Sequence, residues 1–198
     1  MLGAPSFLFI KDSLRYSKNV ERQLKLFKSE IKLTLRRKVL YLISHLFLDF
    51  FFKFFPSGSS MRVCLLKSTG AKIGKNVLVK RGVRVHFPWN LEIGDNCWIG
   101  EEVWFINHEK ITIGSNVCIS QRSIICSGGH DYRSASLAYA HKPVTIKDGA
   151  WVCLDAKVLP GVTIGECSVV SAGEVARKSV PDYSMLSGGE IRPIDPPK

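Results

Sequence analysis

Aliphatic and aromatic residues return at every sixth position along most of the chain after residue 72. The pattern shifts by two residues twice and is then interrupted between positions 128 and 143. Glycine often follows the apolar residue, and a small or compact residue often stands four positions after it. The apolar rows are Ile73, Val79, Val85 and Leu91; Ile93, Ile99 and Phe105; Ile113, Ile119 and Ile125; and Ile146, Val152, Val158, Ile164, Val170 and Ala176.

A period of six fits neither an amphipathic helix nor a half-buried strand. It is typical of a solenoid in which each hexapeptide forms one short strand and one corner, with the periodic residues stacked inside. The alternative, a β-sandwich of short strands, would repeat at roughly 8–12 residues. The pattern therefore predicts a mainly β fold, a left-handed parallel β-helix over residues 71–181.

Three parts are expected along the chain. Residues 1–60 form a helical, partly amphipathic N-terminal segment. Residues 61–183 form the β-helix domain, which carries a loop at 128–143. Residues 184–198 form a C-terminal tail.

The N-terminal segment has helical texture over residues 12–55, because Leu and Phe recur among Lys and Arg and no Pro or Gly interrupts before Pro56. Residues 38–55 are the most apolar stretch, but they are shorter than the ~20 residues that a membrane crossing needs. Residues 56–60, Pro-Ser-Gly-Ser-Ser, are expected to form a linker.

A polar stripe also opposes a membrane crossing. His45, Asp49 and Lys53 are spaced by four, so a helix would place all three on one face. This favours a helix lying at a bilayer interface, and packing on the β-helix or on a subunit partner is the alternative.

The formal charge of +11 is concentrated near the N-terminus, with nine Lys/Arg against two Glu over residues 14–38. Such a segment suits a membrane surface, a nucleic acid or phosphates, and a solvated helix face is the plain alternative. Nucleic-acid binding is set aside, because no aromatic-basic module accompanies the charge. The six cysteines form no CxxC pair and follow no signal peptide, which indicates reduced core residues of a cytoplasmic protein without a metal site.

The longest interruption, residues 128–143, is the candidate site. Insertions in solenoids become surface loops, and such loops often bind ligands. His130 follows two glycines at the start of this loop. A histidine suits general-base chemistry because its pKa lies near neutrality. The alternative reading is an ordinary surface histidine.

Several motifs carry a family resemblance over about residues 62–181. The motifs are GAKIG at 70–74, PWNLEIG at 88–94, VCISQ at 117–121, GHD at 129–131, GAWV at 149–152 and LPGVTIG at 159–165. Together they resemble the hexapeptide-repeat acyltransferases, and among them the O-acetyltransferases of colanic-acid and other exopolysaccharide pathways.

This resemblance implies a homotrimer that binds acetyl-CoA in a groove between neighbouring β-helices. The acetyl group would pass to a sugar hydroxyl, in exopolysaccharide, capsule or O-antigen biosynthesis. The histidine that matches His130 would deprotonate this hydroxyl, which attacks the thioester directly without an acyl-enzyme. Asp131 would either orient the imidazole or merely begin the loop. The basic and apolar N-terminus favours a lipid-linked glycan as the acceptor.

Other positions follow from the same resemblance. Trp151 would lie near the groove, although an aromatic stacked at a solenoid corner is the alternative. Lys178, with Arg177 and Arg192, would lie near the coenzyme phosphates, which favour charge-assisted donors. Ala172 would lie along the pantetheine arm. Asn107, beside a shift of the repeat, would contact the acceptor.

Two departures from the family pattern are visible. Cys153-Leu154 replaces a pair of small residues, so Leu154 is expected to reshape the coenzyme groove. Residues 188–191, Gly-Gly-Glu-Ile, replace the usual ending and put the role of Arg192 in doubt.

Other functions remain as alternatives. A zinc carbonic anhydrase of the same fold would need three converging imidazoles. His86, His108 and His130 fall at different phases of the repeat and are not expected to converge. A non-catalytic scaffold, or an acyltransferase for a small non-sugar acceptor, is also considered.

Overall fold

The computed structural model describes residues 24–28, 33–43 and 58–196. These residues fall into two compact units, which are described separately. The larger unit contains residues 33–43, 58–129 and 140–196, and the smaller one contains residues 24–28 and 130–139. Most of the expected helical stretch 12–55, with the stripe of His45, Asp49 and Lys53, lies outside the described residues.

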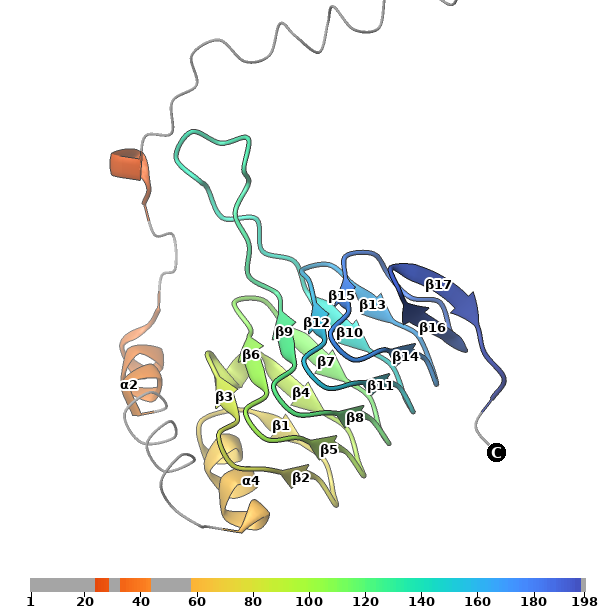
Figure 1. Ribbon diagram of the computed structural model, residues 1–198. Helices are drawn as coiled ribbons and strands as arrows, with labels where there is room; N and C mark the ends of the chain where they lie inside the picture. The colour runs from red at the N-terminus through yellow and green to blue at the C-terminus, as the bar shows by residue number, and fades with distance from the viewer. Residues whose placement is uncertain (1–23, 29–32, 44–57, 197–198) are drawn as a thin grey trace, which may run out of the picture. The chain divides into compact units, whose positions relative to one another are not determined.

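The larger unit is mainly β, and its strands are two to four residues long (Figure 1). Its helices are α2 (Leu35–Ile43), α4 (Ser59–Ser68) and the 3-10 helix η4 (Pro88–Asn90). The strands are β1 (Lys72–Ile73), β2 (Leu78–Val79), β3 (Arg84–Val85), β4 (Leu91–Ile93), β5 (Trp98–Ile99), β6 (Trp104–Ile106), β7 (Ile111–Ile113), β8 (Cys118–Ile119), β9 (Ile124–Cys126), β10 (Val144–Ile146), β11 (Trp151–Val152), β12 (Lys157–Val158), β13 (Thr163–Ile164), β14 (Val169–Val170), β15 (Val175–Ala176), β16 (Ser184–Ser187) and β17 (Glu190–Pro193).

The strands build the three walls of a left-handed parallel β-helix, as the repeat predicts. Sheet A runs β1-β4-β7-β10-β13, sheet B runs β17-β16-β14-β11-β8-β5-β2, and sheet C runs β15-β12-β9-β6-β3. Each coil of the solenoid therefore takes one strand from each sheet in turn. Every pairing between strands of successive coils is parallel, as expected when the chain winds in one direction.

The predicted apolar rows form the core. Every residue of these rows is buried, and Val79, Ile99, Ile119, Val152 and Val170 are fully inaccessible along sheet B. In register, each inward side chain lies directly above the corresponding one of the coil below, as Ile99 does above Val79. Stacked branched side chains fill the narrow interior at every level, which removes their apolar surface from water.

The corners explain the recurrent glycines. A Cβ added to Gly94 would lie 2.7 Å from both the carbonyl carbon and the oxygen of Gly114 in the next coil. Only glycine allows this close approach of two backbones. Later in the same corners, Asn76, Asn96 and Asn116 adopt positive φ angles, a conformation that asparagine tolerates better than most residues.

Helix α4 covers the end of the solenoid at which the chain enters it (Figure 1). Leu66 is buried against the core, and the buried Arg62 donates from Nε to the carbonyl oxygen of Val79 at 2.9 Å. The hydroxyl of Ser59 accepts from the Val79 N–H at 2.7 Å. The expected linker is thus wrong at Ser59 and Ser60, which begin this helix after Gly58.

The expected C-terminal tail is instead largely a hairpin. Strand β16 extends sheet B in parallel with β14, and β17 then pairs antiparallel with β16. Leu186 is buried like the core residues before it. The last coil is shorter than the others, since Val169 and Met185 are in register at a separation of 16 residues. The six-residue repeat therefore does not predict β16.

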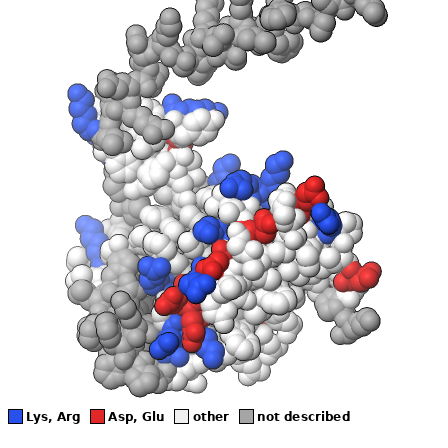
Figure 2. Space-filling view, viewed as in Figure 1, with Lys and Arg blue, Asp and Glu red and all other residues white. Residues whose placement is uncertain are grey.

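Charge on the visible face of the solenoid is mixed rather than basic (Figure 2). Lys and Arg side chains are interspersed there with Asp and Glu, and several pairs link successive coils, such as Arg122 with Asp155 at 2.6 Å. No helix among the described residues is long and apolar enough to cross a membrane.

Replacing one inward side chain should destabilise the solenoid strongly. Ile119→Ala removes a fully buried side chain from the central coils, and we expect a loss of about 2–5 kcal/mol in the free energy of unfolding because the rigid stack cannot close the cavity. Denaturant unfolding at a fixed protein concentration measures this loss. Thr112→Ala, on the outward side of sheet A, is the control and should change stability by less than ~0.5 kcal/mol. Equal losses for the two variants would contradict the stacked core.

Candidate active site

All extra residues of the solenoid lie at one corner, between a strand of sheet C and the next strand of sheet A. We call it the C–A corner; it comprises residues 86–90, 107–110, 127–143, 159–162 and 177–180. Sheet A partners Glu92 and Thr112 are 20 residues apart, Thr112 and Thr145 are 33 apart, and Thr145 and Thr163 are 18 apart. The two short shifts and the long loop of the sequence thus stack on neighbouring coils.

The loop leaves this corner as an antiparallel pair of strands. The Lys142 N–H donates to the Ser127 carbonyl at 3.0 Å, and the Ala140 N–H donates to the Gly129 carbonyl at 2.8 Å. We call residues 127–129 and 140–142 the neck of the loop. The neck belongs to the solenoid unit, and the loop beyond it belongs to the smaller unit.

Three histidine rings form a column at the C–A corner. The ring centroids of His86 and His108 are 4.7 Å apart, and those of His108 and His141 are also 4.7 Å apart with a 23° interplanar angle. The expectation that His86 and His108 do not converge is therefore wrong, and the third ring of the column is His141. Counting by six fails here because the inserted residues change the phase at this corner.

The column explains the two glycines ahead of His130. A Cβ on Gly128 would lie 2.7 Å from Cδ2 of the His108 ring, so a side chain has no room there. Gly129 donates its N–H to Nδ1 of His141 at 3.0 Å. Residues 128 and 129 of the neck are thus held against His141, from the other half of the neck, and against His108 of the preceding coil.

His130 lies in the smaller unit, and its ring is held by the loop itself. Its Nδ1 lies 2.6 Å from the carbonyl oxygen of Leu137. Because a carbonyl can only accept, Nδ1 carries the proton in the neutral ring and Nε2 keeps its lone pair. Leu137 has φ of 51°, and such strained residues concentrate at functional sites. The exposed imidazole therefore presents an acceptor nitrogen, as a general base requires.

Two aromatic rings flank His130 within the same unit. The centroid of Tyr139 lies 5.1 Å away and that of Phe27 5.7 Å away. Phe27 and Tyr139 also contact each other edge to face. These rings limit the orientations that the imidazole can adopt and give it an apolar surrounding.

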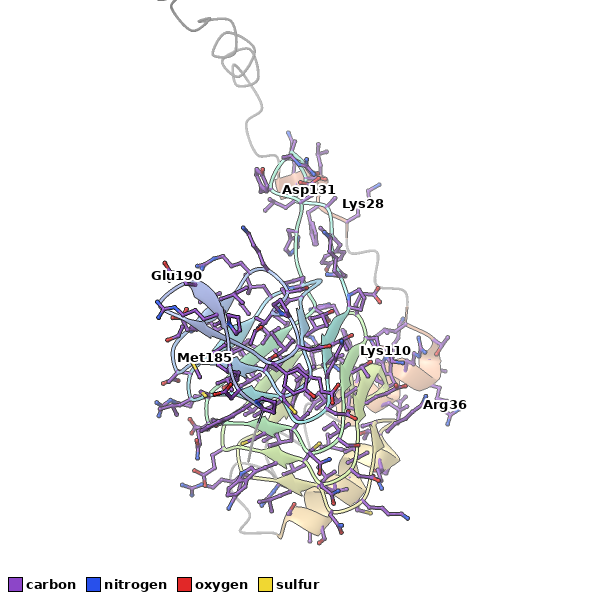
Figure 3. The ribbon with its side chains drawn as sticks, turned by 90° about the vertical axis from the view of Figure 1, so that its right-hand side faces the viewer. Lys28, Arg36, Lys110, Asp131, Met185 and Glu190 are labelled. Carbon is purple, nitrogen blue, oxygen red and sulfur yellow. The ribbon has the colours of Figure 1, made fainter. Side chains whose placement is uncertain are left out.

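Asp131 is engaged elsewhere. Its carboxylate accepts from the Arg133 N–H at 3.0 Å and from Arg133 Nε at 3.1 Å. The N–H and the guanidinium of Arg133 hold the pKa of this carboxyl below its usual range. Because Leu137 provides the partner of the His130 ring, Asp131 fits its second predicted role, that of shaping the start of the loop (Figure 3).

Cysteine chemistry is disfavoured at the loop. Cys126 precedes the neck, and its thiol donates to the Gly128 carbonyl. Burial raises the pKa of this thiol, as it does for Cys118 and Cys153. A protonated thiol is a poor nucleophile, so these residues do not suit an acyl-enzyme mechanism. All six cysteines lie in the described ranges, and none is joined in a disulfide.

Asn107 has a structural role. Its side chain is fully buried, accepting from the Phe87 N–H and donating to the Phe87 carbonyl. A carboxamide committed to the backbone in this way is not available to contact an acceptor.

The residues predicted to contact the coenzyme lie on separate parts of the solenoid. Trp151 stands on the outer face of sheet B with its Nε1 donating to Ser120, while Ala172 and Leu154 occupy the corner between sheets B and C. The Gly173 N–H donates to the Leu154 carbonyl, so these two turns are adjacent. The structure therefore places Leu154 next to Ala172, and both residues lie away from the C–A corner.

The predicted cations are also divided. Arg177 and Lys178 are exposed at the C–A corner, the same corner that carries the loop neck. Arg192 lies on β17 at the far end of sheet B and forms an ion pair with Glu190 at 2.9 Å. Arg192 therefore lies on a different wall from the other two, but at the same end of the solenoid.

Two features of the site are not apparent from the sequence. The fixed proton on His130 depends on a main-chain oxygen, which carries no residue signature. For His141, the sequence shows only that a second histidine lies near the end of the loop, which does not predict its contact with Gly129. Among the described residues, no cluster of three or more His, Cys, Asp or Glu side chains is arranged to hold a metal ion.

Comparison with known proteins points to acetyltransferases. The chain is 42% identical over 127 residues to an Escherichia coli K12 protein provisionally named as a colanic acid biosynthesis acetyltransferase, WcaF; the match covers 64% of this chain and 70% of that one. It is 30% identical over 143 residues to galactoside O-acetyltransferase of the same strain, covering 70% of each chain. No family model matches the sequence.

Solved structures agree on the fold. A hexapeptide-repeat acetyltransferase from Vibrio cholerae, solved with acetyl-coenzyme A, has a TM-score of 0.73 at 24% identity and covers 85% of this chain and 93% of its own. A galactoside acetyltransferase in complex with coenzyme A has a TM-score of 0.71 at 24% identity, covering 87% of this chain and 88% of its own.

Proposed function

The chain belongs to the hexapeptide-repeat acetyltransferases, and from this premise we propose that it transfers the acetyl group of acetyl-CoA to a sugar hydroxyl with His130 as the general base. The observation that carries the assignment is the bond from His130 Nδ1 to the Leu137 carbonyl, which leaves Nε2 as the proton acceptor. The names of the relatives, a galactoside O-acetyltransferase and an acetyltransferase of colanic acid biosynthesis, support a sugar acceptor.

The reaction needs only one proton transfer in each direction. Nε2 of His130 removes the proton from the acceptor hydroxyl as its oxygen attacks the thioester carbonyl. The tetrahedral intermediate then collapses, the carbon–sulfur bond breaks, and the imidazolium returns its proton to the departing thiolate. The products are the acetyl ester and free coenzyme A. Because the hydroxyl attacks directly, the thiols of Cys118, Cys126 and Cys153 have no part in it.

The acceptor proposed here is a glycan of exopolysaccharide, capsule or O-antigen biosynthesis. The exposed position of His130 in a loop, rather than in a closed pocket, suits a bulky acceptor of this kind. The exposed cations Arg177 and Lys178 suit the phosphates of the donor.

The separation of the predicted coenzyme contacts supports a second element of the proposal, a homotrimer. Trp151 and Ala172 lie on sheet B and its corner with sheet C, whereas Lys178 and the loop neck lie at the C–A corner. These residues lie on different walls and corners of one copy, and in a ring a neighbour would bring its own face beside them.

Sheet B has the surface that such a neighbour would cover. Its outward row is apolar from β2 to β16, and Trp98 and Trp151 are each 48% exposed. The outward row of sheet A, by contrast, contains two charged residues and three threonines. The sheet B row consists of Leu78, Trp98, Cys118, Trp151, Val169 and Met185, of which Met185 is labelled in Figure 3.

Helix α2 supports a third element, contact with an anionic membrane surface. Leu35, Val39 and Leu42 are 79%, 49% and 57% exposed and share one side of the helix. Arg36 and Lys38 lie between them in sequence, and Arg36 extends away from the helix in Figure 3. An exposed apolar stripe with flanking cations is the composition of an interfacial helix. It would hold the enzyme near a lipid-linked acceptor.

Loss of the imidazole should abolish most catalysis. His130→Ala is expected to lower kcat by about 10²–10⁴-fold with little change in KM for acetyl-CoA, because only the proton acceptor is removed. Thiol release measured with acetyl-CoA and methyl β-galactoside or purified exopolysaccharide tests this. Tyr132→Phe, a change at a side chain that is 76% exposed in the same loop, is the matched control. Near wild-type turnover by His130→Ala would refute the base assignment.

A charge on the outer face of sheet B should weaken the assembly. Trp98→Glu places a carboxylate in the apolar row, and we expect the mass in solution to fall from about three times 22.1 kDa toward that of one chain. Light scattering after size exclusion measures it. Thr112→Glu makes a comparable change on sheet A and should leave the mass unaltered, whereas dissociation by the sheet A variant alone would overturn the choice of sheet B.

Removing the apolar stripe of α2 should reduce lipid binding. The triple change Leu35→Ser, Val39→Ser and Leu42→Ser is expected to reduce sedimentation with phosphatidylglycerol vesicles. Each substitution removes ~1 kcal/mol or more of the free energy gained by burying an apolar side chain in the bilayer interface. Met61→Ser alters a 49% exposed side chain on α4 and serves as the control. Unchanged sedimentation of the triple variant, or equal binding to neutral vesicles, would speak against the contact.

A further inference from the structure

The segment that leads into His130 is expected from its sequence to have a flexible backbone, but the structure holds it in place. Two consecutive glycines, Gly128 and Gly129, would by default act as a hinge, because glycine has the widest range of backbone conformations. A base on a freely moving hinge would be poorly aligned with its substrate. The neck must therefore be fixed by something other than its own side chains.

We infer that His141 is a positioning residue that fixes this peptide, an inference that rests on the proposed role of His130 as the base. Its Nδ1 accepts the Gly129 N–H at 3.0 Å. Gly129 is the residue immediately before His130, and this bond fixes the Gly128–Gly129 peptide, one peptide group before the one that joins Gly129 to the base.

The bond also defines the state of the His141 ring. Since a backbone N–H can only donate, Nδ1 of His141 holds a lone pair, and the neutral ring carries its proton on Nε2. His130 has the opposite arrangement, with its proton on Nδ1. The two imidazoles thus have different tasks, one receiving a backbone hydrogen bond and the other presenting Nε2 to the acceptor.

His141 can hold the neck because its own ring is anchored. It is stacked on His108 at 4.7 Å and 23°, and His108 contacts His86 of the preceding coil at 4.7 Å. Phe87 lies edge to face with His108 at 5.3 Å. The ring column ties the neck to the rigid coils below it.

Gly128 is fixed by the same column from its other side. The lack of space for a Cβ beside His108 means that the Gly128 backbone lies directly against that ring. The Gly129 carbonyl also accepts from the Ala140 N–H at 2.8 Å, so the peptide groups on both sides of Gly129 are held. The two glycines permit this close approach, and the two histidines remove the mobility that glycine would bring.

Two substitutions separate the hydrogen bond from the ring stack. His141→Phe keeps an aromatic ring against His108 but has no acceptor. His141→Asn loses the ring but places an amide oxygen near the position of Nδ1. If His141 acts through the hydrogen bond, His141→Phe should lose the positioning of the neck and His141→Asn should retain it. If His141 acts only by packing, His141→Phe should retain the positioning and His141→Asn should lose it.

The first measurement is hydrogen–deuterium exchange of the full-length protein, resolved to the Gly129 amide. We expect His141→Phe to accelerate exchange by about tenfold, which corresponds to loss of a typical hydrogen bond, and His141→Asn to restore slow exchange. Wild-type exchange in His141→Phe would overturn the inference. This measurement is independent of acetyl transfer, so failure of the proposed function does not affect it.

The second measurement is transfer from acetyl-CoA to methyl β-galactoside or purified exopolysaccharide. We expect His141→Phe to lower kcat by about 10–100-fold through misalignment of the base, with KM for acetyl-CoA unchanged and with substantial recovery in His141→Asn. Faster Gly129 exchange without a loss of kcat would overturn the positioning role. Full activity of His130→Ala would instead overturn the proposed function, while the exchange result would still stand.

Discussion

The stacking of inward aliphatic side chains in register is the interaction on which the whole molecule depends. Each coil places one apolar residue per wall directly on its counterpart, as Ile113 lies on Ile93 and Ile119 lies on Ile99. A shift of one residue would turn the inward side chains of a wall toward water. The walls therefore have fixed length and phase, and variation is confined to the corners.

Because the walls are fixed, the inserted residues that form the candidate site can lie only at a corner. Added residues accumulate at the C–A corner, first as short extensions on two coils and then as the long loop. Because the extensions stack, side chains far apart in the sequence meet there, and the ring column of His86, His108 and His141 is the result. The loop gains a rigid base from residues that the repeat itself does not require. The walls contribute separately, through the apolar outer row of sheet B.

The sequence predicts the frame of the fold better than it predicts the site. Rows such as Ile146 to Ala176 are visible because one residue type recurs at a fixed interval, and the loop is visible because the interval fails. Inside the loop no interval remains, so the partner of Asp131 and the contact of His141 with Gly129 depend on three-dimensional structure. Asn107 shows the same limit, since a polar residue beside an insertion looks exposed in the sequence but is buried. Strand β16 is missed because its coil is shorter than the others.

The ends of the solenoid have a consequence of their own. A stack of parallel coils exposes unsatisfied main-chain groups at its first and last turns, and such edges invite open-ended growth into fibres. Helix α4 satisfies one edge, where Arg62 and Ser59 occupy the main-chain groups of Val79. At the other, the antiparallel β17 occupies the free edge of β16, so a next coil cannot continue the parallel ladder on β16. These two terminations make the solenoid a particle of fixed length rather than the seed of a filament.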